Sequence, residues 1–153
     1  MPSAKLKAYL DSHQVKYVTI RHSPAFTAQE VAASVHLSGK ELVKSVMVWV
    51  DGKIAMVVLP ANRKVILQDL RARLNAKEVK FATEAEFKSQ FPDCETGAMP
   101  PFGHLYGMEI YAAPSLAEDT LIAFNAGTHA EVIQMAYGDF ERLAQPKIVH
   151  FTT

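Results

Sequence analysis

Two apolar runs joined by a two-residue turn constrain the fold of this chain more than any other feature. Residues 46–50 and 54–59 are rich in β-branched and apolar side chains, and only Asp51, Gly52 and Lys53 separate them. An Asp-Gly pair suits the positive φ angles of a tight turn, so the stretch predicts a β-hairpin. Neither run alternates apolar with polar residues, which indicates that both faces of the strands are covered. We therefore expect the hairpin at the centre of a sheet, covered on both sides.

The composition indicates one globular domain over residues 1–153. About half of the residues are hydrophobic, enough for a real core, and 16 basic residues balance 16 acidic ones. A neutral total gives no general attraction to nucleic acid, so any contact with RNA must come from a local patch. Cys94 is the only cysteine, which excludes a disulfide within the chain and favours a reducing, cytoplasmic location. We see neither a signal peptide nor an apolar run that could span a membrane.

The rest of the chain predicts helices and strands without a strict βαβ order. Capping residues and helical spacing of apolar residues predict helices over residues 4–12, 28–36, 65–74, 84–91 and 140–144. Apolar runs predict further strands over residues 15–20, 79–82, 108–112, 120–125, 130–135 and 147–151. We expect a single mixed α/β or α+β domain, in which a central sheet of about seven strands is flanked by helices.

Most familiar catalytic patterns are absent from the sequence. The six histidines show neither His-Glu-x-x-His nor paired-cysteine spacing, so we expect no metal site. A serine elbow, a phosphate-binding loop and a dinucleotide-binding glycine pattern are also missing. Cys94 with His104 or His129 would make a thiol nucleophile if the two groups met, although an unreactive thiol in a loop is the simpler interpretation.

Three loop-like features remain as candidates. Lys44 opens the central hairpin, and it is either an ordinary solvated strand end or a cation held at the rim of a pocket. Residues 97–103, Gly-Ala-Met-Pro-Pro-Phe-Gly, predict a rigid segment suited to a pocket wall. Residues 125–129, Asn-Ala-Gly-Thr-His, predict a turn whose exposed backbone N–H groups and histidine could meet an anionic or carbonyl oxygen.

The order of these features resembles the YbaK/EbsC family of aminoacyl-tRNA deacylases, which is related to the editing domain inserted in bacterial prolyl-tRNA synthetases. The resemblance rests on Lys44-Ser45 before a Val-rich strand, on residues 97–103, and on Gly127-Thr128-His129 before an apolar strand and Asp139-Phe140. It extends back to His22-Ser-Pro and covers nearly the whole chain. It implies a compact mixed sheet with a pseudo-barrel and surrounding helices.

The resemblance also implies a reaction, the hydrolysis of the ester that joins a wrong, small amino acid to the end of a tRNA. In the family a lysine at the position of Lys44 is the functional hallmark, and the glycine-rich and Gly-x-His segments line the pocket. Our hypothesis is that Lys44 holds the terminal phosphate or the scissile carbonyl, while backbone near Gly103 and Gly127 orients the ester. Neither a cofactor nor a covalent nucleophile is required. His129 is either a general base or a residue that only holds the turn.

Selectivity would then follow from the volume of the pocket. By resemblance and by position, the expected substrate-binding residues are His22, Phe26, Ser45, Met47, Gly97, Pro101, Phe102, Gly103 and Thr128, and the catalytic ones are Lys44, Gly127 and His129. Ser45 stands where some relatives have threonine or asparagine. The Pro-Pro-Phe-Gly segment is closer to the prolyl-synthetase insert, which favours alanine on tRNA for proline over cysteine or serine.

The expected partner is the aminoacylated 3′ end of tRNA, with a synthetase as a further candidate. Lys40, Lys44, Arg63 and Lys64 form a candidate contact patch, and they equally fit an ordinary solvated surface. The competing interpretation is a non-catalytic module that binds a small molecule or a nucleotide end and docks on a synthetase. The test that separates the two is whether Lys44 and the Gly127–His129 turn converge.

Overall fold

The sheet is built outward from the expected hairpin. In the computed structural model, β2 (Leu42–Val50) and β3 (Lys53–Pro60) pair antiparallel along nearly their whole length. Asp51 (φ 48°) and Gly52 (φ 84°) form the turn in the left-handed backbone conformation that the Asp-Gly pair predicts. Asp51 Oδ1 also accepts the backbone N–H groups of Lys77 and Glu78, at 2.9 and 2.8 Å. The tip of the hairpin is thereby fixed to the chain that precedes the next strand.

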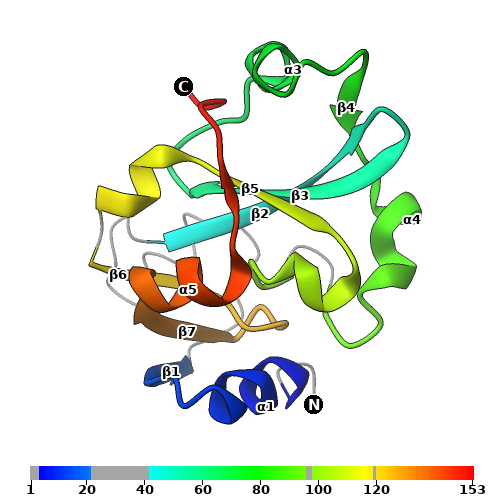
Figure 1. Cartoon of the computed structure of the whole chain (residues 1–153). Coiled ribbons are helices and arrows are strands. Elements are labelled where there is room, and N and C mark those ends of the chain that lie inside the picture. The colour runs from blue at the N-terminus through cyan, green and yellow to red at the C-terminus, as the bar shows by residue number, and fades with distance from the viewer. Residues whose placement is uncertain (1–3, 22–41, 96–97, 119) are drawn as a thin grey trace.

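The structure describes residues 4–21, 42–95, 98–118 and 120–153, and within them it forms an eight-stranded mixed sheet (Figure 1). The strand order is β1-β7-β6-β2-β3-β5-β8, with β4 paired to β2 beside this path. The pairs β2–β6, β3–β5 and β5–β8 are parallel and the others are antiparallel. The remaining strands are β1 (Tyr17–Arg21), β4 (Val79–Phe81), β5 (Glu109–Ala112), β6 (Leu121–Asn125), β7 (Glu131–Ala136) and β8 (Lys147–Ile148). The predicted mixed α/β class is confirmed.

Four α-helices and three 3-10 turns accompany the sheet in the described ranges. They are α1 (Ala4–Ser12), α3 (Leu67–Leu74), α4 (Glu84–Phe87), α5 (Tyr137–Ala144), η1 (Lys88–Gln90), η2 (Gly103–Tyr106) and η3 (Pro114–Glu118). At α4 the predicted capping box forms, and Glu86 Oε1 accepts the Thr83 N–H at 2.8 Å. The helix expected over residues 28–36 lies outside the described residues.

Several predicted boundaries differ from the structure, and for α3 and β8 a distant partner takes the backbone. Helix α3 begins at Leu67 rather than at 65, since Val65 bridges to Thr152 and the Ile66 N–H bonds to the Phe151 carbonyl at 2.7 Å. The same contacts end β8 early, at Ile148 instead of 151. Helix α5 begins at Tyr137, directly after β7, and not at 140.

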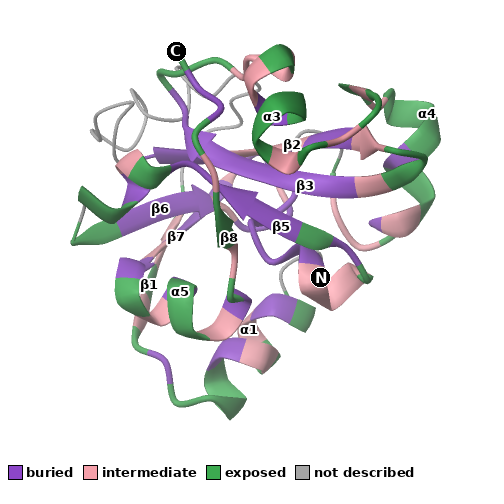
Figure 2. Ribbon diagram, turned by 45° about the horizontal axis from the view of Figure 1, so that its top comes forward, coloured by how far each residue is buried: buried purple, intermediate pink, exposed green. Residues whose placement is uncertain are grey.

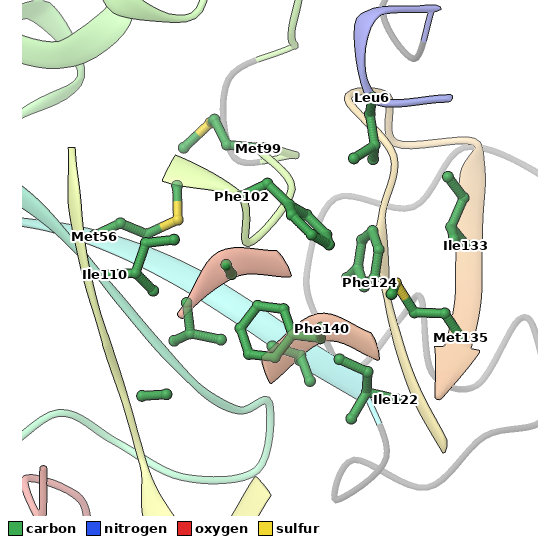
Figure 3. Packing of buried hydrophobic residues seen from close by; sticks show 14 of the residues in the cluster. Leu6, Met56, Met99, Phe102, Ile110, Ile122, Phe124, Ile133, Met135 and Phe140 are labelled. Carbon is green, nitrogen blue, oxygen red and sulfur yellow. The ribbon is translucent and has the colours of Figure 1, made fainter. Parts of the chain in front are cut away.

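Two apolar clusters cover the two faces of the hairpin. The first lies between the sheet and α1, η2 and α5, where the ring of Phe102 is 5.7 Å from that of Phe124 and 5.6 Å from that of Phe140 (Figure 3). The second lies beneath α3 and includes Leu59 and Phe151. Figure 2 shows β3 and β5 as largely buried strands between these layers. Both faces of the central hairpin are therefore covered, as its apolar runs predict.

No helix in the described part of the chain combines the length and hydropathy needed to cross a bilayer.

Candidate functional site

Lys44 lies on β2, opposite Leu59 of β3, on the face of the sheet that carries the second cluster. The side chain is half-buried, and none of the described residues forms a hydrogen bond or an ion pair with its ammonium group. Burial lowers the pKa of Lys44, and the positive charge of nearby Lys64 lowers it further. The described part of the protein thus keeps a partly desolvated cation here without supplying it with a partner.

Asn125 stands beside Lys44. Strand β6 runs parallel to β2, and Val43 pairs with Phe124, both of them in the first cluster. Successive side chains alternate between faces, so Lys44 and Asn125, the next residues along, share the opposite face. Asn125 Oδ1 is shielded from solvent, and no described residue bonds to it. A polar atom in this condition is costly unless something else satisfies it, so Asn125 joins Lys44 as an incomplete group.

The turn after Asn125 is closed by its own contacts. Gly127, at φ 91°, donates its N–H to the Ala98 carbonyl at 2.9 Å, and His129 donates its backbone N–H to Glu95 Oε1 at 3.2 Å. The N–H groups of residues 126 and 130 are bonded within the turn as well. The sequence led us to expect exposed N–H groups here. That expectation was wrong for these four positions, because residues 95 and 98, the Glu131 carbonyl and the Thr128 side chain already use them.

The turn and the predicted pocket wall support each other. In addition to the Gly127–Ala98 bond, the Glu95 N–H bonds to the Gly127 carbonyl at 2.7 Å. Residues 98–103 are buried, and a Cβ at Gly103 would lie only 3.2 Å from Met56 Sδ, so a side chain here would have to displace Met56. The sequence did not indicate Glu95. Its role depends on the fold bringing residues 95 and 129 together.

The other expected site residues lie in different surroundings. Ser45 is half-buried on the face opposite to Lys44, while Met47 (3% exposed) and Phe102 (0%) are part of the first core cluster. Pro101 is buried in the wall, and Thr128 Oγ1 accepts the Ala130 N–H at 3.2 Å. His129 is only 7% exposed. His22, Phe26, Lys40 and Gly97 lie outside the described residues.

Cys94 has partners that do not activate it. Its sulfur lies 3.5 Å from the Tyr106 hydroxyl and 3.7 Å from Asp93 Oδ1. Burial raises the pKa of the thiol to about 11. Since no histidine among the described residues is within hydrogen-bond reach of this sulfur, the cysteine-nucleophile alternative was wrong. In the same residues, no group of three His, Cys, Asp or Glu side chains is arranged to hold a metal ion.

Comparison with known proteins places this arrangement in a family. Residues 22–143 match the aminoacyl-tRNA editing domain. The chain belongs to that family. The resemblance inferred from the order of Lys44, the glycine-rich wall and the Gly-Thr-His turn is thereby confirmed.

Two relatives and one solved structure show how far the similarity of this editing domain extends. It is 31% identical over 97 residues to the multifunctional Ser/Thr-tRNA deacylase ProXp-y of Escherichia coli K12, covering 63% of this chain and 58% of that protein. It is 21% identical over 145 residues to the prolyl-tRNA editing protein ProX of Acetoanaerobium sticklandii, covering 90% and 87%. A crystal structure of a candidate trans-editing enzyme for prolyl-tRNA synthetase superposes with a TM-score of 0.84 at 17% identity, covering 99% and 97%. This last likeness shows the shared fold.

Proposed function

We propose that this editing domain is a trans-acting aminoacyl-tRNA deacylase that hydrolyses the ester of a mischarged tRNA carrying a small amino acid. The observation that carries the proposal is the pair Lys44 and Asn125, two neighbouring polar side chains on one face whose interactions the described protein leaves incomplete. Membership of the editing family supports this reaction class.

The chemistry needs little beyond positioning and charge. Water attacks the ester carbonyl, an oxyanion forms, and the ribose oxygen leaves with a proton, which gives free amino acid and tRNA. The ammonium of Lys44 holds the developing oxyanion or the adjacent terminal phosphate. Because the N–H groups at residues 127 and 129 are already bonded, the lysine carries this stabilisation rather than the turn.

Asn125 and the turn would act beside the lysine. The Asn125 amide accepts a hydrogen bond from the substrate, at its α-amino group or a ribose hydroxyl, which satisfies the shielded Oδ1 atom. Gly127 allows the positive φ of the turn, and His129 lies almost out of reach of water. We therefore assign His129 a positioning role in preference to general base, since its backbone N–H bonds to Glu95 Oε1 and the turn is held against residues 95–98.

The substrate class is a small amino acid, with alanine on tRNA for proline as our first candidate. The E. coli relative is named for serine and threonine, which makes both amino acids candidates, and the relative ProX is named for prolyl-tRNA editing. Cysteine stays a candidate through the family resemblance alone. We place the reaction in the cytoplasm, where aminoacyl-tRNA is used.

The proposal is tested by single-turnover deacylation of tRNA for proline charged with alanine, cysteine, serine or threonine. The same amino acids on their own tRNAs, and proline on its tRNA, serve as controls. We expect at least one mischarged species to be hydrolysed well above the buffer rate while prolyl-tRNA survives. If the folded protein hydrolyses none of them, the deacylase proposal fails and a binding module takes its place.

A further inference from the structure

A groove lies close to Lys44 and has no part in the reaction described so far. This groove, of about 400 Å³, is lined by Arg63, Ser115, Glu118, His150 and Thr152 together with their neighbours. Its residues come from three separate segments, namely the turn after β3, the 3-10 turn η3 after β5, and the last residues of the chain. A hollow in which polar side chains from distant segments converge is a candidate binding site.

The strand register places the groove next to Lys44. Lys44 pairs with Leu59 of β3, and Val58 pairs with Ala112 of β5, so Leu59 stands beside Ala113. Neighbouring strands are about 5 Å apart, which puts the backbone at Lys44 roughly 10 Å from that at Ala113. Residues 114 and 115, which follow at once, line the groove. The two sites therefore lie along one end of the same sheet.

The opposite wall of the groove also leads back to Lys44. The Thr153 N–H donates to the Lys64 carbonyl at 3.1 Å, the Lys64 N–H donates to Thr153 Oγ1 at 3.2 Å, and Val65 bridges to Thr152. The charge of Lys64 is felt at Lys44. Positive side chains thus run from Lys44 through Lys64 to Arg63 at the groove.

The groove offers hydrogen-bond donors suited to an anion. Arg63 uses Nη1 to bond the Thr153 carbonyl at 2.6 Å, which fixes the guanidinium group while its other N–H groups stay available for a planar or tetrahedral anion. Ser115 Oγ is shielded from solvent and bonds to none of the described residues. Glu118 is the acidic side chain at the groove, and it already has an interaction partner. A phosphate fits this set of donors, since guanidinium and hydroxyl groups both donate to its oxygens.

We propose that this groove holds a backbone phosphate of the unpaired 3′ strand of tRNA, upstream of the terminal nucleotide whose ester lies at Lys44. The inference rests on the proposed deacylase function. Proteins that bind single strands use a positive groove that tracks the phosphate backbone. Since this chain has no net charge, the attraction has to come from a local site such as this one.

The test compares two substrates that share the ester and differ in the strand. One is the aminoacyl-tRNA that the protein hydrolyses, and the other is the same amino acid esterified to adenosine, which has no upstream phosphate. Arg63→Ala and Ser115→Ala are assayed beside wild type. Arg73→Ala serves as the matched control, because Arg73 is an exposed arginine on α3 that does not line the groove.

We expect Arg63→Ala to lower kcat/KM for aminoacyl-tRNA about tenfold, mainly through KM, and to leave hydrolysis of the adenosine ester unchanged. The slope of log kcat/KM against log salt should fall by about 0.7, the value for one phosphate contact on a single strand. Ser115→Ala should show a smaller loss of the same kind. Equal losses on both substrates, or no loss on tRNA, would overturn the proposal.

The proposed deacylase function and the proposed phosphate site in the groove can be tested separately. If wild type hydrolyses neither substrate, the function is wrong, and the groove is then judged by the affinity for uncharged tRNA. Weaker binding by Arg63→Ala than by Arg73→Ala would still support the groove. Equal affinities of the two variants for uncharged tRNA would overturn it. An affinity of wild type for tRNA that inorganic phosphate does not lower by competition would overturn it as well.

Discussion

Cys94 and Lys44 are both reactive types of side chain that are partly removed from water, and they differ in the hydrogen-bond partners that surround them. Around Cys94 it supplies Tyr106 and Asp93, and the Tyr106 hydroxyl also donates to both Asp93 oxygens, at 3.1 and 3.3 Å. Around Lys44 it supplies no bonding partner among the described residues, places a second cation nearby, and leaves Asn125 Oδ1 unbonded.

This difference separates a structural cluster from a site. A satisfied polar network rigidifies the fold, and burial then keeps the thiol protonated. An unsatisfied pair loses free energy in the free protein and regains it when a ligand supplies the missing bonds. Changes near Cys94 should therefore alter stability alone, and changes near Lys44 should alter activity alone.

The largest effect on stability should come from Tyr106→Ala. The ring of Tyr106 lies 4.4 Å from that of Phe91, and Lys5 Nζ sits 4.3 Å above its centroid. Removing it should lower the free energy of unfolding by roughly 2–4 kcal/mol, measured by urea denaturation. The deacylation rate per folded molecule should not change. A large loss of rate in the folded fraction would show that the Cys94 cluster takes part in the chemistry.

A smaller effect, this time on activity, is expected from Asn125→Ala. Because its Oδ1 makes no bond to the described protein, the free energy of unfolding should stay within about 0.5 kcal/mol of wild type. Losing one substrate hydrogen bond should lower kcat/KM about tenfold, or about 1.4 kcal/mol. Asn125→Asp is the size-matched control. An alanine variant that is much less stable than wild type and equally active would show that Asn125 is a structural residue and not part of the site.

The smallest effect should be a shift in pH dependence with Lys64→Gln. The charge of Lys64 helps to hold the pKa of Lys44 below its ordinary value, so removing that charge should raise the pKa. If activity needs the protonated lysine, the alkaline limb of the single-turnover rate should move to higher pH, by less than about one unit. The same change at Lys80, an exposed residue of β4, should leave the limb in place. A shift to lower pH in Lys64→Gln would contradict the sign.

The sequence predicted the elements that depend on neighbours in the chain. The β2–β3 hairpin follows from apolar runs around Asp51-Gly52, and the start of α4 follows from Thr83 and Glu86, since each signal is complete within a few residues. The burial of both faces of the hairpin was also predictable, because a strand without polar alternation has no side suited to solvent.

The details of the site were less predictable, because they depend on pairing between distant segments. The parallel register of β2 and β6 puts Asn125 beside Lys44, and no local pattern encodes it. The N–H groups of the 126–130 turn appeared available in the sequence, yet Ala98 and Glu95 use two of them. The sequence therefore indicated which segments mattered and left open which atoms are free to act.

The central claim is tested most directly by single-turnover hydrolysis of the accepted mischarged tRNA with Lys44→Ala and Cys94→Ala side by side. Removing the lysine should lower the rate at least about 100-fold, the scale of losing one oxyanion-stabilising group. The thermal unfolding of that variant should stay close to wild type, while Cys94→Ala should keep the full rate. A Lys44→Ala variant with the wild-type rate, or a Cys94→Ala variant that is folded and inactive, would contradict the account.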